Sequence, residues 1–222
     1  MLLLALDTAT PAVTAALHDG TRVLAAAAQV DARRHGELLL PAIDRVLAEA
    51  GRSLDDVTAL VAGTGPGPYT GLRVGLATAA AIGAARGLPV HGLCTLDGIA
   101  YAAGLAGVAG PFTVATDARR KEVYWARYAD ARTRVAGPAV DRPADVPAEA
   151  ASLTAVGEGA QLYPDAFPAA RGDLPGHASA AALAALAAER LGAGEPLDEP
   201  LPLYLRRPDA RVPAGYKAVL RS

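Results

Sequence analysis

The sequence is poor in cysteine, in aromatic residues and in net charge. Cys94 is the only cysteine among 222 residues, so internal disulfides and multi-cysteine zinc sites are excluded and a reducing compartment is expected. Aromatic residues make up 5% of the chain, and 21 basic side chains nearly balance 23 acidic ones. Because affinity for nucleic acid comes largely from neutralising phosphates, this balance argues against a stand-alone nucleic-acid-binding protein.

Long apolar runs are also missing. The nearest candidate for a membrane span, Val74 to Ala85, lies between two arginines and is shorter than the roughly 18 apolar residues that a span needs. The apolar start of the chain has no basic segment and meets Asp7 too early for a signal peptide. The sequence therefore predicts a cytoplasmic protein with no membrane span.

Alternating apolar segments and turn residues predict a first lobe that mixes strands and helices. The expected elements are a strand at 2–7, a hairpin at 13–17 and 23–29, helices at 35–50 and 72–86, strands at 59–62 and 90–94, and a helix from Thr95 to about residue 109. Thr95 is a candidate N-cap of that last helix. Gly110-Pro111 then breaks the chain, so we place a lobe boundary there.

The second half repeats the opening theme of an apolar strand that ends in aspartate. It contains expected strands at 112–116, 122–128 and 153–157 and an alanine-rich helix at 178–191, whereas residues 136–151 are rich in Pro, Ala and Asp. We predict two α/β lobes, 1–109 and 110–222, each with a mixed sheet flanked by helices.

A glycine-rich turn, residues 63–71, connects an expected buried strand to an expected helix. Such a loop can offer backbone N–H groups to an anion. It is neither a Walker A loop, since no Gly-Lys-Ser/Thr follows, nor a dinucleotide-binding fingerprint, since Thr70 stands where the third glycine would be. A rigid structural turn is an equally open interpretation.

Small residues recur every four positions in the helix that follows. They are Gly71, Gly75, Ala79 and Gly83. Interior glycine costs a helix about 1 kcal/mol relative to alanine, so this row requires close packing in return. The partner is either the chain's own sheet and first helix or another chain. Because the helix is apolar nearly all round, we favour another chain.

Two carboxylates stand where a magnesium–phosphate ligand would be useful. Asp7 and Asp117 each end an expected strand beside small turn residues. Either could instead cap a turn. The four histidines have no metal-ligand spacing, and Cys94, with no nearby base, is expected to be a buried core residue rather than a nucleophile.

Several segments together resemble the TsaB (YeaZ) family, in the family's order and over essentially the full length. They are Leu4-Ala5-Leu6-Asp7-Thr8-Ala9-Thr10, His35 with Leu39-Leu40-Pro41, residues 65–75 (GPGPYTGLRVG), Asp117-Ala118-Arg119 with Glu122-Val123-Tyr124, Gly157-Glu158-Gly159, and Pro202-Leu203-Tyr204-Leu205-Arg206. This chain has Pro68-Tyr69 where the family usually has Ser-Phe.

The resemblance implies a two-lobed actin-like ATPase (ASKHA, RNase H-like) fold and a non-catalytic role. The family supports TsaD, which forms threonylcarbamoyladenosine (t6A) at position 37 of tRNA. Further implied partners are TsaE, a second copy of the chain when TsaD is absent, and tRNA only through the complex. TsaD holds a metal with an H-x-x-x-H pair, and Thr95 and Ile99 occupy those places here. Neither side chain replaces an imidazole ligand.

The resemblance also assigns candidate site residues, none of them catalytic or metal-binding. The expected partner interface is His35, Leu38, Leu39, Ala42, Gly71, Arg73, Val74, Gly75, Ala79, Ile82 and Gly83. The expected vestigial phosphate-binding residues are Asp7, Thr8, Thr10, Gly65, Gly67 and Asp117. No resident cofactor is implied; weak ATP or ADP binding with Mg²⁺, at that eroded site or against TsaD, stays open. The rival hypothesis is a small ATP-dependent, kinase-like enzyme of the same fold.

Overall fold

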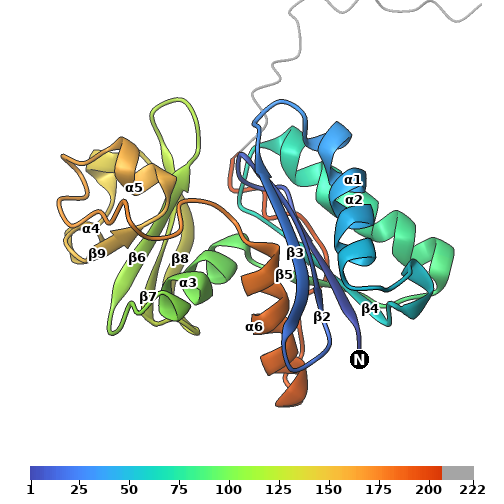
Figure 1. Ribbon diagram of the computed structural model, residues 1–222. Helices are drawn as coiled ribbons and strands as arrows, with labels where there is room; N and C mark the ends of the chain where they lie inside the picture. The colour runs from blue at the N-terminus through green and yellow to red at the C-terminus, as the bar shows by residue number, and fades with distance from the viewer. Residues whose placement is uncertain (207–222) are drawn as a thin grey trace, which may run out of the picture.

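The computed structural model describes residues 1–206, which form two lobes side by side (Figure 1). The first lobe is built on a five-stranded sheet of order β3-β2-β1-β4-β5. Its strands are β1 (Leu3–Asp7), β2 (Ala12–His18), β3 (Val23–Val30), β4 (Ala59–Gly63) and β5 (Val90–Leu93). Strands β1, β2 and β3 are antiparallel neighbours, whereas β4 and β5 run parallel to β1. The expected mixed sheet is therefore confirmed.

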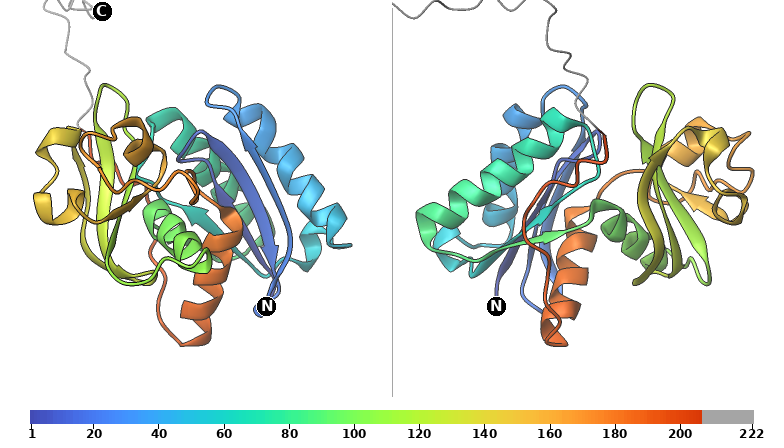
Figure 2. Two further views of the ribbon diagram at one scale, coloured as in Figure 1. Left: turned by 60° about the vertical axis from the view of Figure 1, so that its left-hand side comes forward. Right: turned by 180° about the vertical axis from the view of Figure 1, so that it is seen from behind.

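Helices cover both faces of this sheet. On one face lie α1 (His35–Glu49) and α2 (Tyr69–Arg86), and on the other lies α6 (Ala180–Gly192). Helix α1 turns its apolar positions Leu39, Ile43 and Val46, which recur at helical spacing, into the core. The sides of α1 and α2 that face away from the sheet form one outer surface of the first lobe (Figures 1 and 2), which we call the outer wall.

The second lobe has a four-stranded sheet of order β8-β7-β6-β9. Its strands are β6 (Phe112–Asp117), β7 (Val123–Asp130), β8 (Thr133–Asp141) and β9 (Thr154–Val156). The short helices α4 (Ala148–Ala151) and α5 (Glu158–Leu162) cover one face, and α3 (Thr95–Leu105) covers the other. Two 3-10 turns, η1 (Leu54–Asp56) and η2 (Pro143–Asp145), complete the described elements.

The two sheets share one topology. In each, an antiparallel meander of three strands is followed by a strand parallel to the first, so β8-β7-β6-β9 repeats β3-β2-β1-β4. This is the RNase H-like arrangement, and its duplication is the actin-like ATPase fold that the sequence indicated. The carboxyl ends of β1 and β6, with Asp7 and Asp117, therefore occupy related places in the two lobes.

The structure differs from the sequence analysis in three places. Helix α6 packs on the first sheet and on α3, so the second lobe does not extend over residues 110–222 as predicted. Residues 207–222 of that predicted lobe lie outside the described part of the chain. Strand β8 lies largely within residues 136–151, the stretch rich in Pro, Ala and Asp to which no element was assigned, and Gly137 and Pro138 are tolerated there because β8 is an edge strand. Thr95 is the first residue of α3 rather than its N-cap, which is Cys94, and the Thr95 hydroxyl donates to Asp7.

A buried polar cluster joins the lobes. Asp97 on α3 accepts a hydrogen bond from the Tyr128 hydroxyl of β7 at 2.9 Å. It also pairs with Arg134 of β8 at 3.3 Å and Arg190 of α6 at 3.9 Å. Burial raises the pKa of the Asp97 carboxyl, and the two guanidinium groups oppose that rise. Sequence patterns offered no signal for this cluster, because its members come from four separate elements.

Candidate functional site

Asp7 ends β1 in a fully enclosed position. One carboxylate oxygen accepts the Ala9 backbone N–H at 2.8 Å, and the other accepts the Thr95 hydroxyl at 2.8 Å. Burial raises the pKa of Asp7 to about 6, although both hydrogen bonds favour the ionised form. Gly63 of β4 lies so close that a Cβ there would overlap the carboxylate. Both oxygens of Asp7 are thus held by the chain's own donors.

Thr8 joins the β1–β2 turn to α2. Its hydroxyl donates to the Gly71 carbonyl at 2.7 Å and accepts the Gly75 backbone N–H at 2.9 Å. In an ideal α-helix these two backbone groups, four residues apart, would pair directly. The hydroxyl therefore bridges one step of the helical ladder, and the helix axis comes close to the turn.

The small-residue row of α2 is buried inside the chain. A Cβ at Gly75 would lie 2.7 Å from the Thr8 hydroxyl, one at Gly71 would lie 2.8 Å from the Thr8 carbonyl, and one at Gly83 would overlap Val90. Ala79 is fully buried. The structure thus contradicts the expectation that Gly71, Gly75, Ala79 and Gly83 face another chain. The glycines exist because α2 packs directly on its own lobe.

His35 and Leu39 of the predicted interface are buried as well. The His35 ring nitrogen Nε2 lies 2.9 Å from the Thr10 carbonyl, which ties the start of α1 to the β1–β2 turn. Leu39 is 1% exposed in the first-lobe core. The remaining predicted interface residues, Leu38, Ala42, Arg73, Val74 and Ile82, keep partial or full exposure.

The glycine-rich loop is folded against the β1–β2 turn. A Cβ at Gly67 would overlap the Ala9 carbonyl, and the Gly65 N–H donates to the Thr95 hydroxyl at 3.1 Å. The Thr10 hydroxyl accepts the backbone N–H groups of Ala12 at 3.3 Å and Ala178 at 3.2 Å. Asp7, Thr8, Thr10, Gly65 and Gly67 are therefore gathered in one place, where the polar groups of the first four are bonded to other residues of the chain.

Asp117 lies across from this assembly at the start of the β6–β7 turn. Its carboxylate accepts the Arg119 backbone N–H at 2.8 Å and pairs with the Arg119 guanidinium at 3.1 Å. Arg119, Arg120 and Lys121 all have left-handed backbones, with φ of 61°, 55° and 61°. Each such residue costs about 1–2 kcal/mol, so surrounding contacts must hold this turn.

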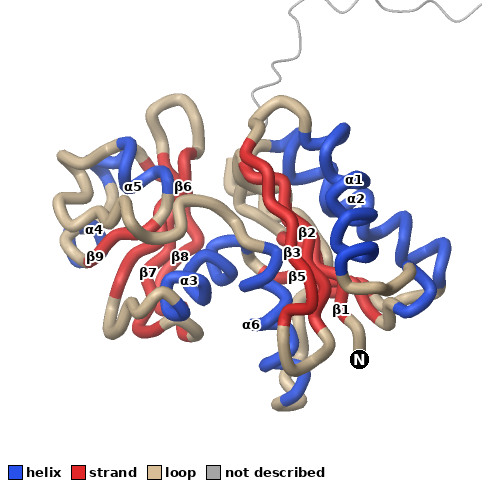
Figure 3. Tube along the Cα trace, viewed as in Figure 1, coloured by secondary structure: helices blue, strands red, loops and turns tan. Residues whose placement is uncertain are grey.

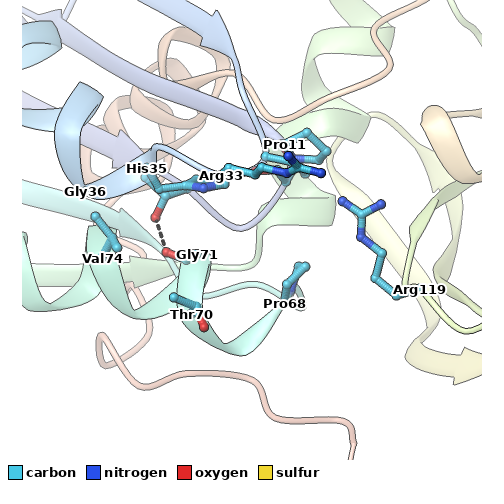
Figure 4. Close-up of a pocket in the computed structure, with 12 residues that line it drawn as sticks. Pro11, Arg33, His35, Gly36, Pro68, Thr70, Gly71, Val74 and Arg119 are labelled. Atoms are coloured by element: carbon cyan, nitrogen blue, oxygen red, sulfur yellow. Dashed lines mark hydrogen bonds between the residues drawn. The ribbon is translucent and has the colours of Figure 1, made fainter.

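A pocket of about 190 Å³ opens where the two lobes meet (Figure 4). Arg33 reaches it from the first lobe and Arg119 from the second, and their guanidinium groups point toward the space between them. Thr70 and Gly71, at the start of α2, form part of its wall, where backbone N–H groups favour an anion. Arg33 and Arg119 were not among the site residues predicted from sequence.

Thr95 and Ile99 are both buried on α3. The Thr95 hydroxyl donates a hydrogen bond to the Asp7 carboxylate. Ile99 is 0% exposed in the core of the second lobe. Among residues 1–206, no three His, Cys, Asp or Glu side chains are grouped so that they could hold a metal ion. Within that same range, no helix is both long and apolar enough to cross a membrane.

Cys94 is buried, as expected, at the end of β5. Burial raises the pKa of its thiol to about 12, which suits a core residue and not a nucleophile.

Comparison with known proteins agrees with this architecture. The model of the family described as "TsaD: tRNA N6-adenosine threonylcarbamoyltransferase" matches residues 26–211. An uncharacterized protein of Mycobacterium tuberculosis is 47% identical over 212 residues, which cover 94% of this chain and 93% of that protein. The solved structure of YeaZ from Pseudomonas aeruginosa is 32% identical, has a TM-score of 0.79, and matches 92% of this chain and 99% of its own.

The chain is also similar to the Escherichia coli protein "tRNA threonylcarbamoyladenosine biosynthesis protein TsaB". It is 40% identical over 129 residues, which span 58% of this chain and 55% of that protein. The duplicated sheets define an actin-like fold, and the family match places the chain among proteins related to tRNA threonylcarbamoyladenosine formation. Within that class, the chain belongs to the TsaB (YeaZ) family.

Proposed function

We propose that this protein is a non-catalytic subunit of the machinery that makes t6A at position 37 of tRNA, and that it binds TsaD through the outer sides of α1 and α2. The observation that carries the proposal is the composition of this wall. Leu38, Ala42, Val74 and Ile82 are half-buried apolar residues on it, and Leu40 is 57% exposed. Partly exposed apolar side chains on adjacent helices are typical of a protein interface.

The outer side of α2 is suited to close approach. Ala77, Ala80, Ala81, Ala84 and Ala85 are all exposed, so the helix presents small side chains outward as well as inward. A partner helix could pack near its backbone without displacing long side chains. The proposed interface therefore keeps Leu38, Ala42, Arg73, Val74 and Ile82 and replaces the buried row with this alanine-rich side.

The proposed lack of catalysis is supported by the state of Asp7. Both of its oxygens accept hydrogen bonds from within the chain, and the nearby loop backbones contact one another. A magnesium–phosphate ligand would have to displace the Thr95 hydroxyl and separate Gly67 from Ala9. Thr95 and Ile99, where TsaD has its histidine pair, are core residues with no metal-ligating atom beyond one engaged hydroxyl.

The sequence analysis left weak nucleotide binding open either at the eroded site or against TsaD. The pocket between Arg33 and Arg119 favours binding against TsaD. It adjoins the start of α2, and so lies beside the proposed TsaD wall. Two guanidinium groups can bind the phosphates of ATP or ADP held between the subunits. The same proposal includes TsaE as a further partner and contact with tRNA only through the complex. It also includes a homodimer of this chain when TsaD is absent. This function requires tRNA, which places the protein in the cytoplasm.

The wall is tested with two alanine-to-arginine variants. We expect Ala81→Arg, on the outer side of α2, to weaken TsaD binding at least about 100-fold (~3 kcal/mol), because the complex would bury an unpaired charge. Ala193→Arg, at an exposed position beyond α6, is the matched control and should bind TsaD normally. Both affinities are measured by titration calorimetry.

Equal affinities for the two variants would refute the proposed wall. The catalytic claim has its own test, since t6A formation should require TsaD at any concentration of this chain. Modification of tRNA by the isolated chain would refute the non-catalytic role, and phosphoryl transfer by it would favour the kinase-like rival.

A further inference from the structure

The described chain ends in a segment that returns along the first lobe. After α6, the Asp198 carbonyl accepts the Gly92 N–H at 2.7 Å, so the segment pairs with the edge of β5. Further on, the Leu203 N–H donates to the Thr64 carbonyl at 2.8 Å, beside the glycine-rich loop. Figure 2 shows this segment rising from α6 along the first lobe. We call residues 198–206 the C-terminal strap.

Tyr204 fixes the strap to the start of α2. Its ring stacks on that of Tyr69, with centroids 5.4 Å apart, and its hydroxyl oxygen accepts the Arg73 Nε–H at 2.7 Å. The Arg73 guanidinium also lies 3.8 Å from the centroid of the Tyr69 ring. Stacked, cation–π and hydrogen-bonding contacts thus act together on one tyrosine side chain. The end of the strap is therefore well placed relative to the first lobe.

Arg206 then crosses to the second lobe. Its Nη2 donates to the Arg119 carbonyl at 3.1 Å and to the Glu122 carboxylate, so one guanidinium bonds both ends of the β6–β7 turn. The Glu122 N–H donates to the same Arg119 carbonyl at 3.0 Å. Figure 3 shows that this turn projects at the end of the molecule where α1 and α2 begin.

The turn needs such support. Three successive residues with side chains, Arg119, Arg120 and Lys121, adopt the left-handed backbone, a conformation that persists only where surrounding contacts impose it. Asp117 supplies one contact, through the Arg119 N–H, and Arg206 supplies another at the opposite side of the turn. The first of these three residues is the one that reaches the pocket opposite Arg33.

We propose that Arg206 is a positioning residue: the C-terminal strap, fixed on α2 by Tyr204, holds the β6–β7 turn so that Arg119 faces Arg33 across the pocket between the lobes. The functional part of this proposal rests on the proposed role in t6A formation. The structural part stands without it, because every contact lies within this chain. Arg206 acts through Arg119 and need not touch a ligand itself.

Backbone hydrogen exchange tests the structural part on the isolated full chain. The Ala118 N–H, bonded to the Glu122 carbonyl at 3.0 Å, and the Glu122 N–H report opening of the turn. Arg206→Ala should speed their exchange about tenfold, because a charge-assisted hydrogen bond is lost. Arg206→Lys should restore part of the protection. Arg22→Ala, which removes an exposed arginine from the distant β2–β3 turn, is the control and should change neither amide.

Amides of β1 report global unfolding in the same spectra. If Arg206→Ala speeds exchange of the β1 amides as much as that of the turn amides, the variant has destabilised the whole fold, and Glu122→Gln is measured instead. Glu122→Gln weakens only the charged contact with Arg206. It should speed exchange of the turn amides and leave that of the β1 amides unchanged. The proposal is overturned if the turn amides of Arg206→Ala exchange at the wild-type rate. It is also overturned if Glu122→Gln speeds exchange of the turn amides and of the β1 amides equally.

The functional arm uses the chain in complex with TsaD. Arg206→Ala should bind TsaD with wild-type affinity yet lower t6A formation at least about fivefold, with partial rescue by Arg206→Lys, because Arg206 contacts the β6–β7 turn and not the outer wall, and Tyr204 still holds the strap on α2. Faster turn exchange with unchanged t6A formation overturns the link between turn and function. Failure of the wild-type chain to bind TsaD would count against the proposed function alone, since the exchange result still decides the role of Arg206.

Discussion

Replacing Gly75 with alanine is a sharp test of how α2 packs on its lobe. In an exposed helix this change stabilises, by about 1 kcal/mol, because alanine is the better helix former. Here the new methyl group would lie 2.7 Å from the Thr8 hydroxyl, well inside van der Waals contact. That hydroxyl cannot rotate away freely, since it bridges the Gly71 carbonyl and the Gly75 N–H.

The expected magnitude follows from these opposing effects. Displacing the hydroxyl loses two buried hydrogen bonds, each worth about 1 kcal/mol, and overpacking adds about 1–3 kcal/mol. After subtracting the gain in helix propensity, about 1 kcal/mol, Gly75→Ala should destabilise the fold by about 2–4 kcal/mol. For a chain of this size, that corresponds to a fall in Tm of roughly 4–16 °C.

The assay is urea unfolding followed by circular dichroism, with two companion variants. Gly36→Ala, in the first turn of α1 with no atom within 4 Å of the new methyl group, should be neutral or stabilising by up to about 1 kcal/mol. In a Thr8→Ala background the obstructing hydroxyl is gone, so Gly75→Ala should no longer be costly. Equal effects of Gly75→Ala in both backgrounds, or a gain in stability in the wild-type background, would refute the bridging role of Thr8.

Two further predictions concern buried titratable groups. Burial raises the pKa of Asp7 from 3.8 to about 6, so the folded state binds more protons than the unfolded state between these values; stability relative to Asp7→Asn should therefore fall as pH rises from about 4 to about 7, by about 3 kcal/mol at the limit. Parallel stability–pH curves for the two proteins, measured by urea unfolding, would show that the Asp7 pKa is unshifted. The Cys94 thiol, whose pKa burial raises to about 12, should react with a thiol reagent at pH 8 only as fast as the protein unfolds. Rapid labelling of the folded protein at that pH would contradict its burial.

Local patterns predicted most of the first lobe. The strand ending in Asp7, the hairpin after it and the helix beginning at His35 all depend on nearby residues, through turn chemistry and helical periodicity. The same logic located β6 and β7, because the strand ending in Asp117 repeats the opening theme. The grouping of Asp7, Thr8, Gly65 and Gly67 came instead from the family resemblance, because spacing alone left the glycine-rich loop open between a phosphate loop and a rigid turn.

The remaining features depend on contacts between distant segments. The spacing showed that Gly71, Gly75 and Gly83 form one row, but a periodic row does not indicate which part of this chain, or which other chain, packs against it. In the structure, Thr8 and Val90 pack against this row. Nor does the sequence show that α6 returns to the first sheet. Arg33 and Arg119 lie 86 positions apart and meet only because the lobes are placed side by side.

The return of α6 has a consequence for synthesis of the chain. Leu3, Ala5 and Val61, on the inner face of the first sheet, are covered by Leu183 and Leu186 of that helix. A ribosome therefore completes the second sheet before the first can close its hydrophobic core, and the opening strands emerge long before their cover does. A protein ending after residue 109 would expose that face to water and should aggregate, so the half that begins the polypeptide is the last to be finished.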